Sequence, residues 1–394
     1  MDITIIPKQL QGSVHVIPSK SQAHRVLICA AFSDKPTHIF CSQSGKDLRA
    51  TVHCLQALGA TIQPTPDGYF VQPANNLPKE AILPCGESGS TLRFLLPIVG
   101  ALGVDATFFM EGRLSQRPLS PLWEEMERMG CRLSRSSQTS LRCYGRLRSG
   151  KYTLTGNVSS QFVSGLLLAF PLMKGNSCIT IIGDLESRSY VDMTQAVIAR
   201  FQVDTSNFAV TGSHVYKSPG SISIDGDWSN GAYFHAANSL GSALQIYNLD
   251  PNSLQGDRIV TELIPKLRDN MVIEASAIPD LVPILSVVAA ANSGCTFTNI
   301  QRLRLKESDR VASIIQMLKA MGIRAQSTET TLTIFPGKFR GGVVDAVNDH
   351  RIAMSAAIAA TIASDPVQII GAGCVDKSYP LFWDEFARLG GIYE

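Results

Sequence analysis

The stretch LQALGATIQPTPDGYFVQ, residues 55–72, contains the end of an amphipathic helix, a glycine, an alternating strand, a polar turn and a second strand. A glycine directly after a helix is typical of a C-cap, because it adopts the left-handed backbone conformation without steric cost. The alternation that follows predicts a β-hairpin. Residues 126–145 and 318–337 repeat this design, so the sequence predicts a fold assembled from helix and hairpin units.

The spacing of the capping positions extends the repeat over the chain. A fourth copy is expected at residues 197–217, with Phe201 in the place of the glycine. The capping positions recur at intervals of 71 or 68 residues: 59, 130 and 201, then 322 and 390. The interval between positions 201 and 322 leaves room for one more unit, with a helix around 257–268. Six units of about 65 residues, three in each of two similar α/β domains, are therefore expected, although helix and hairpin segments of this kind also recur by chance.

Composition restricts the classes of function. A chain of 394 residues with 45% hydrophobic and 17% charged residues predicts a well-packed protein of two domains. The net charge of +2 argues against the broad basic field that nonspecific nucleic-acid binding requires. The nine cysteines have no CxxC spacing and the seven histidines are dispersed, which argues against a zinc site or a disulfide framework. We expect a reduced protein without a metal.

Targeting and nucleotide motifs are also missing from the sequence. The first residues, MDITIIPKQL, lack the pattern of a signal or transit peptide. The longest apolar stretches, near 281–291 and 352–363, are too short or too polar for a membrane span. GAGCVDKS at 371–378 resembles a phosphate loop but lacks the glycine before Lys-Ser. We therefore expect a cytoplasmic protein that binds neither a membrane nor a nucleotide cofactor.

Positively charged side chains stand beside most of the predicted helix starts. They occur in PSKSQAHR, GESGSTLRF, SQRPL, LKESDR, NDHRIAM and DKSYP, as Lys20, Arg25, Arg93, Arg117, Lys306, Arg310, Arg351 and Lys377. Any single case is usually an N-cap beside a solvated cation. Because free helix N–H groups and a cation can hold the same anion, the repetition favours small ligands with several phosphate or carboxylate groups.

Two carboxylates are candidates for acid and base chemistry. Asp280 lies in SAIPDLVPILSVVAAA, where it is either the N-cap of the apolar helix or a base in apolar surroundings. Glu307 lies between Lys306 and Arg310, where a structural ion pair is an equally good interpretation.

Taken together, these motifs resemble the 5-enolpyruvylshikimate-3-phosphate synthase family. The resemblance runs from IPSKSQAHR near residue 17 to DKSYP at 376–380 and rests on the order of PSKS, GESGSTLRF, SQRPL, SSQF, DLVP, LKESDR and NDHRIAM. It implies two similar domains of three βαβαββ units each, in an inverted α/β-barrel-like architecture. It also implies that residues 18–224 form the shikimate 3-phosphate side and that residues 1–17 plus 225–394 form a discontinuous phosphoenolpyruvate side. The active site would lie in the cleft between these domains, which would close on the substrates.

The resemblance further implies an enzyme that moves the enolpyruvyl group of phosphoenolpyruvate to the 5-hydroxyl of shikimate 3-phosphate, as a monomer without cofactor or metal. The residues implied in binding shikimate 3-phosphate are Lys20, Ser21, Arg25, Ser159, Ser160, Gln161, Ser187, Tyr190, Asp280 and Lys306. Those implied in binding phosphoenolpyruvate are Lys20, Gly89, Arg117, Gln161, Arg310, Arg351 and Lys377. Asp280 would accept the proton of the 5-hydroxyl, and Glu307 or Lys20 would protonate the methylene carbon on the way to a tetrahedral intermediate.

Departures from the family pattern and two alternatives remain. Four residues differ from those of many relatives: Glu87, Phe94, Arg302 and Trp228. They bear on substrate contacts more than on the reaction. The nearest alternative is an enolpyruvyl transferase acting on a UDP-sugar, but such enzymes typically carry a reactive cysteine in the loop at 111–120, where this chain has none. A noncatalytic metabolite-binding protein is the alternative from another class, and the retention of Lys20, Asp280 and Glu307 argues against it.

Overall fold

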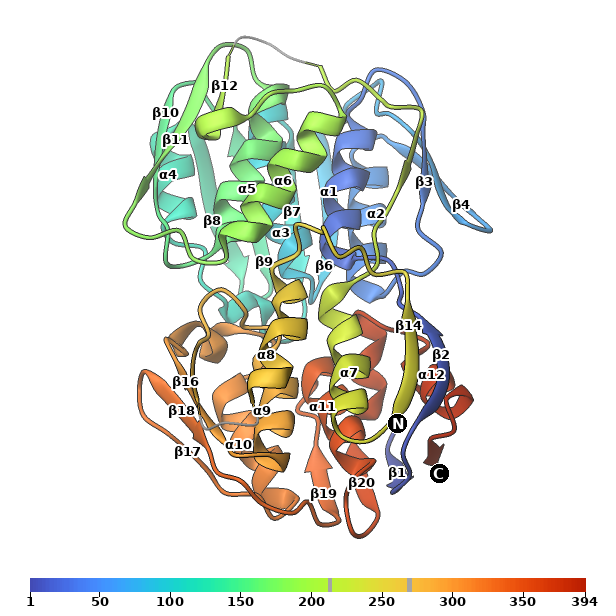
Figure 1. Cartoon of the computed structure of the whole chain (residues 1–394). Coiled ribbons are helices and arrows are strands. Elements are labelled where there is room, and N and C mark those ends of the chain that lie inside the picture. The colour runs from blue at the N-terminus through green and yellow to red at the C-terminus, as the bar shows by residue number, and fades with distance from the viewer. Residues whose placement is uncertain (212–214, 268–270) are drawn as a thin grey trace. The chain divides into compact units, whose positions relative to one another are not determined.

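The chain forms two compact units. The computed structural model describes residues 1–211, 215–267 and 271–394. Pro18–Ile224 form one unit, here called the inserted unit, and Met1–Ile17 with Asp225–Glu394 form the other, here called the terminal unit (Figure 1). Residues 212–214 of the expected fourth repeat copy, and residue 268 of the helix expected at 257–268, lie outside the described residues.

The inserted unit alternates helices and short strands. Its helices are α1 (Lys20–Ala31), α2 (Lys46–Ala57), α3 (Gly89–Leu102), α4 (Leu122–Arg128), α5 (Ser160–Ala169) and α6 (Arg188–Arg200). Its strands are β3 (Thr37–Phe40), β4 (Thr61–Thr65), β5 (Gly68–Gln72), β6 (Glu80–Gly86), β7 (Asp105–Met110), β8 (Cys131–Ser137), β9 (Ser140–Gly145), β10 (Lys151–Thr155), β11 (Ser177–Ile182), β12 (Ala209–Val210) and β13 (Ser221–Ser223). They form the sheets β13-β3-β5-β4, β6-β7-β9-β8 and β10-β11-β12.

The terminal unit has the same alternation. Its helices are α7 (Trp228–Ser239), α8 (Val260–Lys266), α9 (Val282–Ala291), α10 (Arg310–Ala320), α11 (His350–Ala360) and α12 (Phe382–Arg388). Its strands are β1 (Ile3–Ile6), β2 (Gln11–His15), β14 (Ala243–Tyr247), β15 (Met271–Glu274), β16 (Cys295–Thr298), β17 (Ala325–Ser327), β18 (Thr331–Ile334), β19 (Gly342–Asp345), β20 (Val367–Ile370) and β21 (Ile392–Tyr393). They form the sheets β15-β16-β18-β17, β19-β20-β1-β21 and β14-β2.

The four-stranded sheets of both units share one pattern of strand directions. Two parallel strands are followed by two strands that each run antiparallel to the one before. A helix connects the parallel strands β6 and β7, β15 and β16, and β19 and β20 along the chain, as such crossovers require. The prediction of an α/β fold built from repeated units is confirmed. Among the described residues, the sheets β10-β11-β12 and β14-β2 have fewer strands than the expected unit.

Two of these sheets are completed by strands that are distant in sequence. β13 pairs in parallel with β3, although about 180 residues separate them along the chain. β1, near the N-terminus, pairs with both β20 and β21, so that Ile5 lies opposite Tyr393. The two termini of the chain therefore meet in one sheet of the terminal unit (Figure 1).

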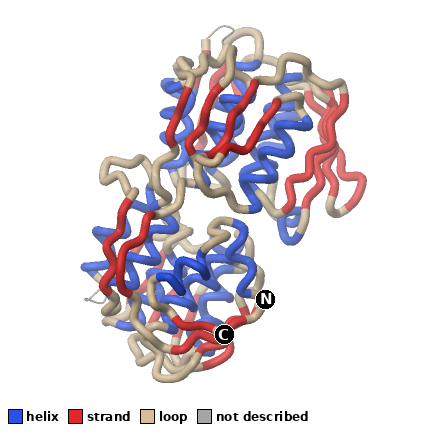
Figure 2. Tube along the Cα trace, turned by 90° about the vertical axis from the view of Figure 1, so that its right-hand side faces the viewer, coloured by secondary structure: helices blue, strands red, loops and turns tan. Residues whose placement is uncertain are grey.

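Helices form the core of each unit, and the strands lie outside them (Figure 2). The helices buried on nearly all sides are α1, α3, α5, α7, α9 and α11. A helix that is buried on nearly all sides has no solvated face and belongs to the core. The strands alternate, which leaves Ile82 and Val272 on the outer sheet faces, 66% and 68% exposed. The charged residues at the starts of the buried helices are therefore held by a rigid core.

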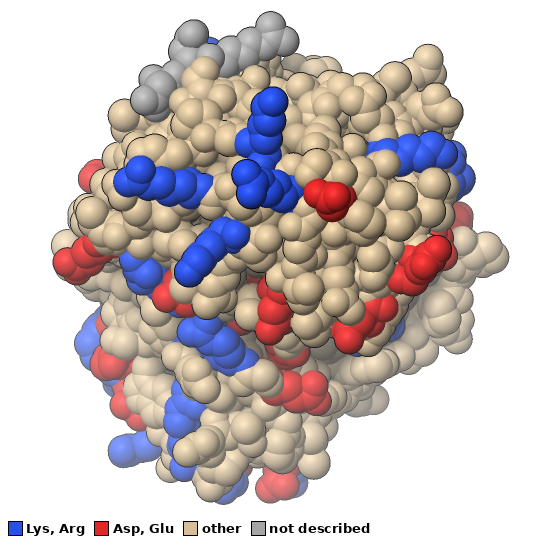
Figure 3. Space-filling model, turned by 90° about the horizontal axis from the view of Figure 1, so that it is seen from below, with Lys and Arg blue, Asp and Glu red and all other residues tan. Residues whose placement is uncertain are grey.

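The surface does not concentrate one sign of charge on the face drawn in Figure 3. Lysines and arginines are interspersed there with aspartates and glutamates, and most of the face is uncharged. Throughout the described ranges, no helix is long and apolar enough to cross a membrane. The face drawn in Figure 3 therefore offers no broad basic surface to a small anion.

The capping glycines adopt the expected backbone conformation. Their φ angles are +101°, +114°, +80° and +89° at Gly59, Gly130, Gly322 and Gly390. The expectation that Phe201 takes the place of the glycine is wrong. Phe201 has a φ of −96° and ends α6 as Leu58 ends α2, while the next residue, Gln202, has a φ of +59°. The left-handed position is thus shifted by one residue, because the buried phenylalanine occupies the apolar position before it.

Side chains cap the helices that carry cations at their starts. Ser19 caps α1 and Ser88 caps α3 by accepting a backbone N–H of the first turn. Asp309 caps α10 and Asp349 caps α11 in the same way.

Candidate functional site

A cluster of charged side chains in the terminal unit is centred on Arg310. Its guanidinium donates to three carboxylates, with Nη1 at 2.6 Å from Asp280, Nη2 at 2.5 Å from Glu307 and Nε at 2.9 Å from Asp349. The Arg310 side chain is 1% exposed and Asp349 is fully buried. Such planar multidentate pairing is a property of arginine that lysine lacks. We call Asp280, Lys306, Glu307, Arg310, Asp349 and Arg351 the Arg310 cluster.

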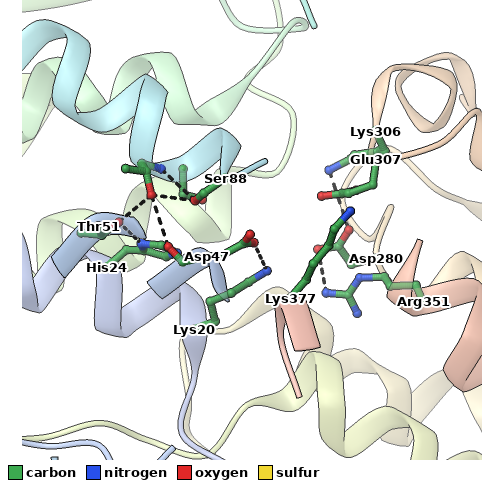
Figure 4. Close-up of polar contacts among 12 residues, drawn as sticks. Lys20, His24, Asp47, Thr51, Ser88, Asp280, Lys306, Glu307, Arg351 and Lys377 are labelled. Carbon is green, nitrogen blue, oxygen red and sulfur yellow. Dashed lines mark hydrogen bonds and ion pairs between the residues drawn. The ribbon is translucent and has the colours of Figure 1, made fainter. Parts of the chain in front are cut away.

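Asp280 lies at the meeting point of three cations. It precedes α9, but the N-cap is Leu281 and no side chain caps that helix, so the interpretation of Asp280 as a cap is wrong. Its carboxylate instead contacts Arg310 at 2.6 Å. Figure 4 shows its other two contacts, with Arg351 at 3.1 Å and with Lys306 at 3.8 Å. Burial acts to raise the pKa of Asp280, but Arg351, Lys306 and Arg310 together hold it well below its usual value. The carboxylate is therefore ionised at neutral pH.

One lysine, Lys306, belongs to this cluster, and a second, Lys377, lies beside it. Burial lowers the pKa of Lys306 to about 8, although Asp280 opposes the shift. A lysine with a pKa near neutrality can hold or release a proton under physiological conditions. Lys377 ends the short 3-10 helix η6 (Ala372–Lys377), and its Nζ donates to the backbone oxygen of Asn348 at 2.8 Å, just before Asp349. The starts of α10 and α11 and the end of η6 thus bring these predicted residues together.

In the inserted unit, Lys20 is held at the start of α1. Its Nζ lies 2.8 Å from Asp47 in the first turn of α2, and the two side chains are 19% and 13% exposed (Figure 4). An ammonium with this much exposure can exchange one anionic partner for another. Asp47 was not among the predicted residues. An acidic residue in the first turn of a helix is normally attributed to the helix dipole, so the sequence carries no sign of its pairing with Lys20.

Arg25 is directed into the protein. It is 2% exposed, and its guanidinium donates to the Thr194 hydroxyl at 2.6 Å and to the backbone oxygens of Ser21 and Tyr190 at 2.5 and 3.0 Å. Burial lowers its pKa to about 10. These contacts tie α1 to α6, and the contact of Arg25 with a substrate stays a prediction.

A second predicted group lies around the start of α3. A side chain added at Gly89 would place its Cβ 2.7 Å from Nη1 of Arg117, so the guanidinium lies directly against the glycine. Gln161, in the first turn of α5, donates to the Ser90 hydroxyl at 2.9 Å and accepts from Nη1 of Arg93 at 2.8 Å. Gly89, Arg117 and Gln161 are therefore joined through the first turns of α3 and α5.

The predicted hydroxyl residues lie at the starts of α5 and α6. Ser159 caps α5 by accepting the N–H of Gln161, and Ser160 begins that helix. Ser187 precedes α6 with a φ of +54°, a conformation that is uncommon for a residue with a side chain and is enriched at functional sites. Tyr190 lies in the first turn of α6.

Asp257 is a buried carboxyl that the sequence did not indicate. It lies in the short 3-10 helix η4 (Gly256–Ile259), accepts a hydrogen bond from Ser229 and is 1% exposed. Burial, reinforced by Asp280, raises its pKa to about 6. Its surroundings depend on residues far away in the chain, so no local pattern could have identified it. Within the described ranges, no group of His, Cys, Asp and Glu side chains has an arrangement that could hold a metal ion.

The raised pKa of Asp257 leads us to expect that the stability of the protein depends on pH. The unfolded chain binds the proton with a pKa of 3.8, and the folded chain with a pKa of about 6. The stabilising contribution is therefore complete below pH 3.8 and is lost as the pH rises through 6. We expect Asp257→Asn to abolish this loss, measured as a smaller decrease in the free energy of unfolding by urea across that interval. If the free energy of unfolding of Asp257→Asn decreases as much as that of the wild type over this pH interval, Asp257 does not cause the decrease.

Comparisons with known proteins agree in one family. The model of the EPSP synthase family, described as 3-phosphoshikimate 1-carboxyvinyltransferase, matches residues 5–386. A 3-phosphoshikimate 1-carboxyvinyltransferase of Clostridium kluyveri is 38% identical over 99% of this chain and 97% of its own length. One of Clostridium beijerinckii is 35% identical over 100% and 98%.

Solved structures share the fold. An EPSP synthase of Acinetobacter baumannii superposes with a TM-score of 0.80 over 100% of this chain and 99% of its own, at 24% identity. The enolpyruvyl transferase NikO of Streptomyces tendae does so with a TM-score of 0.76 over 100% and 98%, at 17% identity. At these identities the structures support the architecture alone.

Proposed function

Because the chain belongs to the EPSP synthase family, we propose that it transfers the 1-carboxyvinyl (enolpyruvyl) group of phosphoenolpyruvate to the 5-hydroxyl of shikimate 3-phosphate and releases inorganic phosphate. The family match over residues 5–386 is the observation that carries this proposal. Relatives that are 35% and 38% identical along their whole length bear the name of this activity. The substrates are then phosphoenolpyruvate and shikimate 3-phosphate.

For shikimate 3-phosphate we propose a set of hydroxyl and charged side chains. Hydroxyls at the starts of α5 and α6 suit a phosphate, because each helix start offers backbone N–H groups beside a serine hydroxyl. The proposed contacts are Lys20, Ser21, Arg25, Ser159, Ser160, Gln161, Ser187, Tyr190, Asp280 and Lys306. Asp280 would lie against the 5-hydroxyl.

Phosphoenolpyruvate carries a phosphate and a carboxylate on a small frame. Guanidinium groups match both anions, and several are needed to neutralise a dense negative charge. The proposed contacts are Lys20, Gly89, Arg117, Gln161, Arg310, Arg351 and Lys377. Arg310 and Arg351 already hold carboxylates in the Arg310 cluster, so a substrate anion would enter an environment built for negative charge.

The chemistry proceeds by addition and elimination. The oxygen of the 5-hydroxyl bonds to C2 of phosphoenolpyruvate while Asp280 takes the hydroxyl proton and C3 receives a proton from Glu307 or Lys20. The resulting tetrahedral intermediate loses inorganic phosphate and one proton of its new methyl group, which restores the double bond. Substrate anions that engage Arg351, Lys306 and Arg310 weaken the interactions that depress the pKa of Asp280, which makes Asp280 a stronger base when the substrates are bound.

A phosphate-release assay tests the reaction. The purified chain should release inorganic phosphate only when phosphoenolpyruvate and shikimate 3-phosphate are both present. Omission of shikimate 3-phosphate, or its replacement by the UDP-sugar acceptor of the related enolpyruvyl transferases, should abolish release. Release with the UDP-sugar alone would identify the other branch of the family, and binding without release would favour a noncatalytic protein.

Gly89→Ala should weaken the binding of phosphoenolpyruvate. The new Cβ would lie 2.7 Å from Nη1 and 3.1 Å from Cζ of Arg117, so the guanidinium must move. Displacement of a substrate-positioning group by about 1 Å can cost on the order of 100-fold. We expect KM for phosphoenolpyruvate to rise while KM for shikimate 3-phosphate serves as the internal control and stays unchanged. An equal rise in both KM values would contradict a local effect on Arg117.

A further inference from the structure

Helices α1 and α2 are joined by two side-chain contacts that lie one helical turn apart. In the first turn, Lys20 Nζ lies 2.8 Å from Asp47. In the next turn, His24 Nδ1 lies 2.7 Å from the hydroxyl oxygen of Thr51 (Figure 4). Residues i and i+4 share one face of a helix, so Lys20 and His24 face α2 together while Asp47 and Thr51 face α1.

The second contact continues to the start of α3. The Thr51 hydroxyl lies 2.6 Å from that of Thr91, and Thr91 donates to the Ser88 hydroxyl at 2.7 Å. Ser88 is the N-cap of α3 and directly precedes Gly89. We call His24, Thr51, Thr91 and Ser88 the hydroxyl chain. It joins α1, α2 and the N-cap of α3 through three consecutive hydrogen bonds.

Burial separates the two contacts between α1 and α2. His24, Thr51 and Thr91 are fully buried, whereas the side chains of Lys20 and Asp47 are 19% and 13% exposed. Hydrogen bonds in a buried chain are not exchanged with water and strengthen one another. The Lys20–Asp47 ion pair has access to solvent and to competing anions, so it is the contact that can open.

His24 enters the hydroxyl chain as a neutral imidazole. Burial, then Lys20 and Arg25, hold its pKa well below the usual value. Because Thr91 donates to Ser88, it can accept from Thr51, which in turn can accept from the N–H at Nδ1 of His24. The other ring nitrogen, Nε2, has no hydrogen-bond partner among the described residues. The His24 tautomer that carries its proton on Nδ1 therefore provides a donor for each of the three hydrogen bonds of the hydroxyl chain.

We propose that His24, Thr51 and Thr91 are positioning residues that keep the starts of α1, α2 and α3 in register while Lys20 exchanges Asp47 for a substrate anion. The inference rests on the proposed function, in which Lys20 contacts both substrates and Gly89 lies against phosphoenolpyruvate. When the ammonium leaves Asp47, the hydroxyl chain is what holds Lys20 at a fixed distance from the backbone of Gly89. These residues touch no reacting atom and act through Lys20 and the start of α3.

Thr51→Val is the decisive variant, because it removes the central hydroxyl and keeps the shape of the side chain. We expect kcat/KM for phosphoenolpyruvate to fall by about 10- to 100-fold, as for other supporting contacts of catalytic groups. Thr51→Ser retains the hydroxyl and should restore most of this loss. Both variants are assayed by phosphate release, and their melting temperatures are recorded in parallel.

Thr37→Val is the matched control. Thr37 in β3 is also fully buried, and its hydroxyl lies 2.7 Å from that of Ser218, away from the hydroxyl chain. This control should lower the melting temperature as Thr51→Val does, yet keep the wild-type kcat and KM. A structural role for Thr51 would make the two variants kinetically alike, and that result would overturn the proposal.

Substitutions of His24 keep the proposal testable if Thr51→Val does not fold. The amide of His24→Asn can reach the position of Nδ1 and preserve the contact with Thr51, whereas that of His24→Gln reaches toward the position of Nε2. We expect His24→Asn to retain more activity than His24→Gln, and equal activities would overturn the proposal. The wild-type assay separates this inference from the reaction itself, since failure of the wild type to release phosphate would refute the proposed function independently of the variants.

Discussion

Asp280→Asn should lower kcat by about 100- to 10,000-fold, the range associated with loss of a general base. The amide keeps the size of the side chain but cannot accept the hydroxyl proton. It also removes the negative charge that Arg310, Arg351 and Lys306 share in the free protein. These cations then attract substrate anions more strongly, so KM for both substrates should stay the same or fall. Phosphate release under saturating and limiting substrate measures the two constants separately.

Asp105→Asn is the matched control for this result. Asp105 also pairs with an arginine, Arg142 at 2.6 Å, and its exposure of 27% is close to the 22% of Asp280, but Arg142 is 51% exposed whereas Arg310 is 1% exposed. It should keep the wild-type kcat. A higher KM with an unchanged kcat in Asp280→Asn would mean that Asp280 binds substrate without acting as a base. If Asp280→Asn does not fold, Asp280 serves to stabilise the Arg310 cluster, and its role as the base is contradicted.

Arg310→Met should lower the free energy of unfolding by about 3–5 kcal/mol, as expected when one partner of a buried ion pair is removed. Methionine has no charge to offer Asp280, Glu307 and Asp349, which lie within 2.5 to 2.9 Å of the guanidinium. Urea denaturation at neutral pH measures the loss. Arg142→Met, which opens the exposed pair with Asp105, should cost less than about 1 kcal/mol. Equal losses in the two variants would show that burial adds nothing to the Arg310 pairs.

The loss caused by Arg310→Met should depend on pH. In the wild type the pKa of Asp280 is well below its unfolded value of 3.8, so its ionised form contributes stability above that pH. The contribution is lost as the pH falls through the folded pKa. Without Arg310 the pKa of this carboxylate rises, and protonation removes the buried charge. The difference between wild type and variant should therefore be largest at neutral pH and shrink in acid.

Local features of the protein were predictable because they depend on residues within one or two helical turns. Gly59 and Gly322 adopt the left-handed conformation that their place after an amphipathic helix requires. Ser19 and Ser88 each accept a backbone N–H in the first turn of their helices, a contact within one helical turn. The prediction at Phe201 was wrong because the packing of its buried ring, which local residues do not determine, places the left-handed residue one position later.

Contacts of the candidate site depend on the tertiary structure. The residues next to Asp280 in the sequence suggested a helix N-cap. Its carboxylate instead binds Arg310 and Arg351, which lie 30 and 71 residues away along the chain. The hydroxyl chain likewise joins His24 to Thr51 and Thr51 to Thr91, 27 and 40 residues apart. Neither hydrophobic periodicity nor a capping motif predicts contacts between residues so far apart in the sequence.

The repeated α/β architecture and the residue types that suit anionic substrates were predictable from the order of the amino acids. Apolar periodicity, glycine conformation and helix capping depend on residues close together in the chain, so they can be predicted from the sequence. The tertiary structure alone decided which carboxylate meets which cation and which side chains lose water. Charge pairing and pKa depend on burial and on distances across the fold, which packing of the buried helices sets.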